Sequence, residues 1–207
     1  DLRVLVGHFG TAQLDLGQHL VQQAAFDQRV AAGLQLADEL LLQQAVKADA
    51  AAHAGLGLPD QLVVETPAAG AFAVAANGSA APLWLDAKDH AGVLRAAGDL
   101  QADIEQVTGK RPSLSSTERP SAKQVIIVGT LGKSVLIDRL VASGKLSTTD
   151  LKGKWESFVI TTVSQPFPGV EEALVIAGSD KRGTIFGIYE LSEQLGVSPW
   201  YWWADVP

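Results

Sequence analysis

A run of apolar, mostly β-branched residues, Gln124-Val-Ile-Ile-Val128, is the feature that most constrains the fold of this chain. An unbroken apolar run of this length is typical of a strand that is covered on both faces, whereas a strand with one face in water alternates polar and apolar residues. Such a strand needs a layer of other elements on each side. The run therefore predicts a sheet with helices packed on it.

Strands and helices alternate along the chain from residue 82 onwards. Strands are predicted at 82–86, 124–128, 156–163 and 173–177, and helices at 90–107, 134–143 and 184–195. Gly109, Gly144 and Gly196 end the three helices. The last two strands flank a Pro-rich turn at 165–169, which is typical of a hairpin. The order β-α-β-α-β-β-α predicts an α/β fold, a layered mixed sheet with right-handed crossovers.

Residues 1–75 have a different character. Apolar residues recur at helical spacing within 11–54, and this pattern predicts an α-helical N-terminal segment. Residues 1–70 carry eight acidic and three basic residues, a net charge of −5, which leaves −2 of the total of −7 for the remainder. The stretch 67–78 is rich in small residues and indicates a boundary. We therefore expect two parts: a helical lead or extension over 1–75, native to the domain or not, and an α/β domain over 76–207.

The composition excludes several classes of protein. The chain has 207 residues and no Cys, so it has no disulfide framework and no Cys-based metal site. A net charge of −7 and a pI near 5.0 argue against nucleic-acid binding. Its apolar runs are well below the roughly 18 residues of a membrane span, so no membrane partner is expected. The chain also lacks Met and shows no signal-peptide pattern, so we expect it to be processed or part of a longer protein.

Two glycine-bounded loops follow predicted strands. The first, at 129–134, ends in Gly132-Lys133-Ser134, but a phosphate-binding loop would need a glycine where Ile127 stands. Nucleotide binding is therefore a weak alternative, and we expect Ser134 to cap the next helix. The second, at 178–183, lies where ligands dock in α/β folds, although Asp180, Lys181 and Arg182 also suit plain surface ion pairs. Both interpretations of the second loop stay open.

No motif predicts a metal, a cofactor or a catalytic residue. The spacing of His8, His19 and His53 fits no ligand pattern. Asp89 is predicted as the N-cap of the helix that begins at residue 90. Asp86 and Asp89, and likewise Glu171 and Glu172, lie in turns or at helix starts without a partner for acid–base work. Asn77-Gly78-Ser79 matches a glycosylation sequon, to which we assign no role.

An aromatic cluster near residue 200 is the sharpest local signal. The segment Pro199-Trp-Tyr-Trp-Trp203-Ala-Asp205 places four aromatic residues in a row. Since not all these rings fit into one core, some should line a cleft that stacks sugar rings, or pack against a following domain. The two interpretations are compatible.

Residues 81–207 resemble the N-terminal domain of glycoside hydrolase family 115, the xylan α-glucuronidases. The matching segments are LWLDAKDHAGVLRAAGDLQADIEQVTGKRPSL, VIIVGTLGKSVLIDRLVASGKL, LKGKWESFVI and PFPGVEEALVIAGSDKRGTIFGIYELSEQLGVSPWYWWADVP. The most specific part begins at Ala173 and runs through the aromatic cluster. Residues 1–70 take no part in the resemblance.

The resemblance implies a non-catalytic accessory domain of a large, exported enzyme, secreted or periplasmic. That enzyme would remove glucuronic or 4-O-methylglucuronic acid side groups from glucuronoxylan. Its catalytic carboxylates would lie in a following (β/α)₈ barrel, which would be the main partner of this chain. A stand-alone carbohydrate-binding or interdomain packing module is the alternative.

The resemblance also implies candidate substrate-binding residues. Asp205, Trp202 and Trp203 would border the uronic-acid pocket, and Asp205 would hold a sugar hydroxyl rather than perform chemistry. Lys181 and Arg182 would face the cleft and favour an anionic sugar. No catalytic residue is expected within the chain, because the resemblance puts the catalytic residues beyond Pro207, in the barrel.

Overall fold

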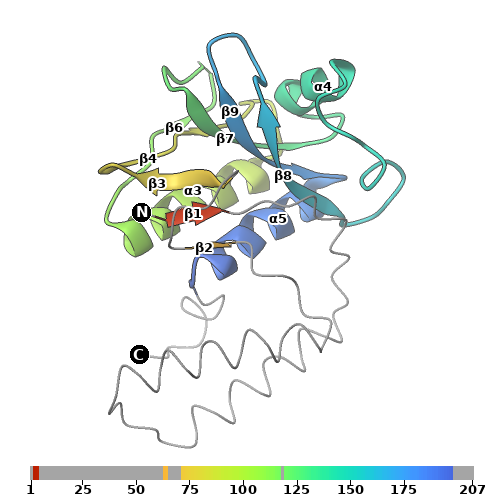
Figure 1. The fold of residues 1–207 in the computed structure, drawn as a ribbon. Coiled ribbons are helices and arrows are strands. Elements are labelled where there is room, and N and C mark those ends of the chain that lie inside the picture. Colours follow the sequence, from red (N-terminus) through yellow and green to blue (C-terminus); the bar gives the residue numbers. More distant parts are fainter. Residues whose placement is uncertain (1, 5–62, 65–70, 118, 198–207) are drawn as a thin grey trace, which may run out of the picture. The chain divides into compact units, whose positions relative to one another are not determined.

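A five-stranded mixed sheet lies at the centre of the fold (Figure 1). The computed structural model describes residues 2–4, 63–64, 71–117 and 119–197. The sheet has the order β6-β5-β7-β9-β8, in which β6, β5, β7 and β9 are parallel and β8 is antiparallel to β9. Its strands are β5 (Leu83–Trp84), β6 (Leu114–Ser115), β7 (Gln124–Thr130), β8 (Phe158–Ser164) and β9 (Glu172–Gly178). The predicted α/β fold and the predicted hairpin are confirmed.

Helices cover both faces of this sheet. The described helices are α3 (Ala91–Thr108), α4 (Val135–Ala142) and α5 (Lys181–Gln194). Val125 and Ile127 of β7 pack in one buried cluster with α4. On the other face α3 and α5 contact each other, and Gly187 of α5 lies against Ile176 of β9. The apolar run of β7 is thus buried on both sides, as its sequence predicts.

A second, antiparallel sheet has the order β2-β1-β3-β4. It consists of β1 (Leu2–Val4), β2 (Val63–Val64), β3 (Phe72–Ala76) and β4 (Ser79–Ala80). β1 and β2 fall within the range predicted as a helical lead, and β3 crosses the predicted boundary at residue 75. The helical pattern at 11–54 lies outside the described residues, so the division into two parts stays a prediction.

A two-residue turn joins β3 to β4. Asn77 and Gly78 both have positive φ, 52° and 78°, and Ala76 pairs with Ser79 across them. This is the type I′ turn that Asn-Gly favours in hairpins. Asn77 and Gly78 of the sequon therefore form a hairpin turn. The Asn-Gly pair is the sequence signal for the strands on either side of it, which the small-residue composition of this stretch did not predict.

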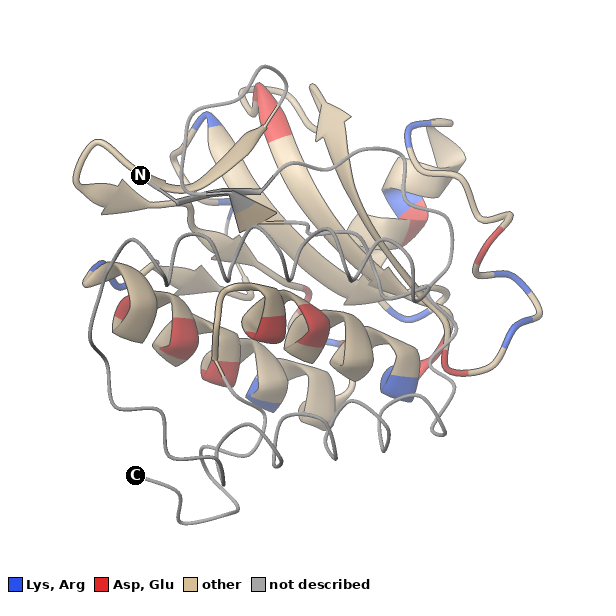
Figure 2. Ribbon diagram, turned by 60° about the horizontal axis from the view of Figure 1, so that its bottom comes forward, with Lys and Arg blue, Asp and Glu red and all other residues tan. Residues whose placement is uncertain are grey.

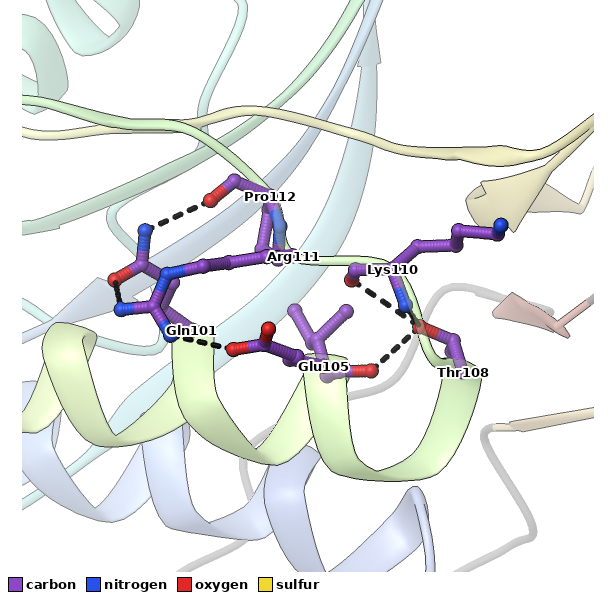
Figure 3. Close-up of polar contacts among 7 residues, drawn as sticks. Gln101, Glu105, Thr108, Lys110, Arg111 and Pro112 are labelled. Carbon is purple, nitrogen blue, oxygen red and sulfur yellow. Dashed lines mark hydrogen bonds and ion pairs between the residues drawn. The ribbon is translucent and has the colours of Figure 1, made fainter.

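Polar side chains fix the exit from α3 (Figure 3). Gln101 donates from Nε2 to the Pro112 carbonyl at 2.7 Å, and its Oε1 accepts from Arg111 at 2.9 Å. Arg111 also pairs with Glu105 at 2.5 Å. These contacts hold the start of the segment that leads into β6, an edge strand that lies between the predicted helix at 90–107 and the predicted strand at 124–128.

Candidate functional site

The sheet changes winding direction between β5 and β7. The helix after β5 lies on one face and the helix after β7 on the other, and ligands of such sheets bind at the carboxyl ends of the strands at this point. Phe158, the first residue of β8, pairs with Gly178, the last of β9, so the segment before β8 lies at the same edge. We call this the carboxyl edge; its residues are 86–89, 130–134, 155–156 and 179–182.

Two aspartates after β5 join that strand to the end of β7. The buried carboxylate of Asp89 accepts from the backbone N–H of His90 at 2.7 Å and of Thr130 at 2.8 Å. The carboxylate of Asp86 accepts from the N–H of Lys88 at 2.9 Å and of Val135 at 2.8 Å. Asp89 was predicted as the N-cap of α3, but His90 holds that position, because the Asp89 side chain reaches across to β7 instead.

The loop after β7 offers no free cradle for a phosphate. Its amides donate to carboxylates and carbonyls of the protein: Gly132 N–H bonds Asp138 at 2.8 Å, and Leu131 N–H bonds the Gly178 carbonyl at 2.9 Å. The N–H groups of Lys133 and Ser134 both bond the Thr130 carbonyl. Since phosphate binding at a helix N-terminus needs free N–H donors, this arrangement gives no support to the nucleotide-binding alternative.

Ser134 is the N-cap residue of α4, as predicted, but its side chain makes no capping bond. The side chain is fully buried, and its Oγ has no hydrogen-bond partner within the described part of the chain. It packs on Gly129, where an added Cβ would lie 2.5 Å from that Oγ. The Ser134 side chain therefore packs against β7 and does not face a ligand. The carboxylate of Asp86 caps α4 in its place.

Asp180 is the N-cap of α5. Its carboxylate accepts from Gly183 N–H and from Glu156 N–H, each at 2.8 Å, and therefore ties the start of α5 to the segment before β8. Partial burial alone raises the pKa of this carboxyl, but the backbone N–H groups of Glu156, Gly183 and Arg182 and the Arg182 charge outweigh it and hold the pKa below its usual 3.8. Because of this cap, α5 begins at residue 181, three residues before the predicted start.

Lys181 and Arg182 occupy the first turn of α5. Both are exposed, and Arg182 pairs with Glu156 at 2.8 Å and lies 5.7 Å from the ring centre of Phe186. Arg182 thus forms a surface ion pair with Glu156 rather than with Asp180, and the ligand interpretation of this loop stays a prediction.

The other predicted substrate-binding residues, Trp202, Trp203 and Asp205, lie outside the described residues. Their role at a uronic-acid pocket therefore stays a prediction. Pro207, beyond which the catalytic residues are expected, also lies outside the described residues. The expectation of a catalytic barrel after Pro207 likewise stays a prediction.

Trp155 is a member of the carboxyl edge that the sequence analysis did not single out. Its side chain is 84% exposed, although β8, which begins three residues later, has several buried residues. The segment LKGKWESFVI has no helical or strand pattern that distinguishes an exposed Trp from a core one. The sequence signal was only its neighbours, since two lysines precede it within three residues.

An open cavity of about 570 Å³ lies around the turn between β8 and β9. Its two lysines are engaged by the protein: Lys145 donates to the Gln165 carbonyl, and Lys123 pairs with Glu171 at 2.8 Å.

Within the described ranges, no group of three or more His, Asp or Glu side chains is gathered as for a metal ion. None of the helices described is long and apolar enough to cross a membrane.

The fold and this edge define a doubly wound α/β domain whose edge carboxylates bind its own backbone. A comparison with solved structures finds a family GH115 4-O-methyl-α-glucuronidase with specificity for decorated arabinogalactans. The match has 31% identity and a TM-score of 0.47, and covers 62% of this chain and 15% of that protein. The chain therefore spans a small part of that enzyme's length. No family model and no curated protein match the chain. The matched enzyme belongs to the family that residues 81–207 resemble in sequence.

Proposed function

We propose that this chain is the non-catalytic accessory domain of an exported glycoside hydrolase. The parent enzyme removes glucuronic or 4-O-methylglucuronic acid side groups from a polysaccharide of the glucuronoxylan type. The observation that carries the proposal is the sequence resemblance over residues 81–207, which extends through four separate segments. The barrel that performs the chemistry is the expected partner of this domain.

The carboxyl edge supports a non-catalytic role. Glycoside hydrolysis needs two carboxyl groups that face one substrate, one of them available as an acid. At this edge Asp86, Asp89 and Asp180 are each bonded to two backbone N–H groups, and Glu156 is paired with Arg182. These carboxylates stabilise loops, and none of them is free to protonate a leaving group.

The test is the release of (4-O-methyl)glucuronic acid from glucuronoxylan, measured for this chain alone and for the parent enzyme. We expect no turnover by the chain and clear turnover by the parent. Uronic-acid release by the chain alone would contradict the accessory role. A parent that hydrolyses no uronic-acid-substituted polysaccharide would contradict the assignment to this class of enzyme. Decorated arabinogalactan belongs in the same assay, because the matched enzyme is specific for it.

A further inference from the structure

Asn77 is the single asparagine of the chain, and a glycine follows it. An asparagine amide is chemically labile when the next residue has no side chain, because the backbone nitrogen of that residue can then reach the amide carbon. Asn77 and Gly78 are both exposed at the turn between β3 and β4, and a Cβ built on Gly78 would meet nothing within 4 Å. The turn therefore has room for a ring to form between the two residues.

The closed turn holds the two reacting atoms apart. Asn77 has the left-handed conformation of a type I′ turn, in which the backbone nitrogen of the next residue points away from the side chain. Ring closure therefore needs the turn to open for a moment. β4 has only two residues and lies at the edge of its sheet, next to β3, so opening breaks few bonds. Short edge elements of this kind open locally far more often than the whole protein unfolds.

We propose that Asn77 is a site of spontaneous deamidation. The backbone nitrogen of Gly78 loses its proton and attacks Cγ of Asn77. A C–N bond forms there, the bond from Cγ to the amide nitrogen breaks, and ammonia leaves with the proton. The product is a succinimide ring. Water then adds to either carbonyl of the ring and opens it, which gives aspartate or isoaspartate, so water is the co-reactant and one ammonia leaves for each chain.

The isoaspartate product changes the backbone of the hairpin. In this product the main chain runs through the former side chain, so the loop between Ala76 and Ser79 gains one carbon atom. Those two residues pair directly across a loop of two residues, and just beyond them Ala81 donates to the Val74 carbonyl at 2.8 Å. A longer loop does not match this register. Because Val74 is fully buried, we expect the change to loosen part of the core under β3.

Both products carry a new carboxylate where the hairpin has no charge. The residues of β3, its turn and β4 include no Lys, Arg, Asp or Glu (Figure 2). Deamidation adds one negative charge to the net −7 of the chain, so ion-exchange chromatography separates the products from the starting chain. The variant Asn77→Asp carries the same charge on an unaltered backbone and favours the same turn. It therefore separates the effect of the charge from that of the extra carbon atom.

The test incubates the folded full chain at pH 8.5 and follows Asn77 by peptide mass spectrometry, with the chain unfolded in urea as the reference. We expect one ammonia per chain, a gain of one mass unit at Asn77, and a mixture of aspartate and isoaspartate. The folded chain should react on the order of tenfold more slowly than the unfolded one. Both rates should rise about tenfold per pH unit, because the attacking amide must lose a proton. In urea, Gly78→Ala should slow the reaction about tenfold, since the added Cβ crowds the attacking nitrogen.

Two results would overturn the site: a folded chain unmodified at Asn77 after about ten half-times of the unfolded reaction, or a Gly78→Ala chain that reacts in urea as fast as the wild type. The purified isoaspartate form should melt about 3 °C or more below the starting chain. Asn77→Asp should melt within about 1 °C of it. An isoaspartate form that melts as high as Asn77→Asp would contradict the loss of register. No substrate enters the experiment, so its outcome is independent of the proposed function.

Discussion

Single glycines show how closely the elements approach one another at the carboxyl edge. Gly183 lies in the first turn of α5, where an added Cβ would meet the Ser157 carbonyl oxygen at 2.2 Å. Gly178 is similarly crowded, since its Cβ would lie 2.1 Å from the Thr184 nitrogen. Both contacts are with backbone atoms, which cannot turn aside as a flexible side chain can. The closeness of β9, α5 and the start of β8 therefore depends on the absence of a side chain.

We predict opposite effects for two Gly→Ala substitutions in helices. Gly183→Ala should destabilise the protein by about 2 kcal/mol or more, because of the clash with Ser157. Gly98→Ala, in α3, should stabilise it by up to about 1 kcal/mol, because nothing lies within 4 Å of the new Cβ and Ala is the better helix former. Urea unfolding measures both. A stabilising Gly183→Ala would show that β8 and α5 are further apart than described.

The pair of helices α3 and α5 contains an acidic group in an unfavourable place. Asp103 is 4% exposed, and this burial raises the pKa of its carboxyl above 3.8. The Ser192 hydroxyl lowers the pKa of Asp103, although its oxygen makes no bond of full hydrogen-bond geometry within the described residues. The negative charge of Asp99 raises the pKa of Asp103 further. Asp99 accepts a hydrogen bond from the Tyr189 hydroxyl at 2.9 Å. Burial is the main cause that raises the pKa of Tyr189 to about 12, and the bond to Asp99 is the second.

The burial of Asp103 between α3 and α5 therefore predicts that Asp103→Asn stabilises the folded protein to an extent that depends on pH. A carboxyl whose pKa is higher in the folded state favours folding only while it is protonated, and this contribution is lost as the pH rises through the folded pKa. At pH 7 the wild type holds a buried charge that Asn lacks, so the variant should melt higher, on the order of 2 °C. The advantage should vanish below about pH 4.

Thermal melts at pH 7 and pH 3.5 check this expectation. Glu105→Gln is the matched control on the same helix, since it breaks only an exposed pair with Arg111 and should shift the melting temperature little at either pH. A lower melting temperature for Asp103→Asn at pH 7 would mean that the Asp103 charge is stabilising in its place.

The elements differ in how far the sequence alone predicts them. The helices and the strands of seven residues were predicted to within about three residues, because their apolar patterns and terminal glycines are local signals. β1, β2 and β6 have two or three residues each, too few to show a period, and exist only through partners distant in sequence. The bond from Val135 N–H to Asp86 spans 49 residues and has no local signal at all.

At the scale of the whole molecule, Asp89 connects the two halves of the doubly wound sheet. It is the buried link between the end of β5 and the end of β7, where the helices diverge to opposite faces. Asp89→Ala should lower the free energy of unfolding by about 2–4 kcal/mol, because two N–H donors lose a charged acceptor and one of them is buried. The exposed neighbour Lys88→Ala should cost less than about 0.5 kcal/mol. Denaturant titration of both variants tests this, and equal stabilities would contradict the link.

The carboxylates of Asp86 and Asp138 occupy the positions that an anion from solution would take at the loop before α4. Asp86 accepts from the N–H of Val135 and Asp138 from the N–H of Gly132, each at 2.8 Å, so an anion free in solution competes with an acceptor that is already in place. A free anion would have to displace a carboxylate of the chain, and the displaced carboxylate would stay nearby and repel it. Free phosphate or sulfate should therefore compete poorly at the amides of this loop at ordinary buffer concentrations.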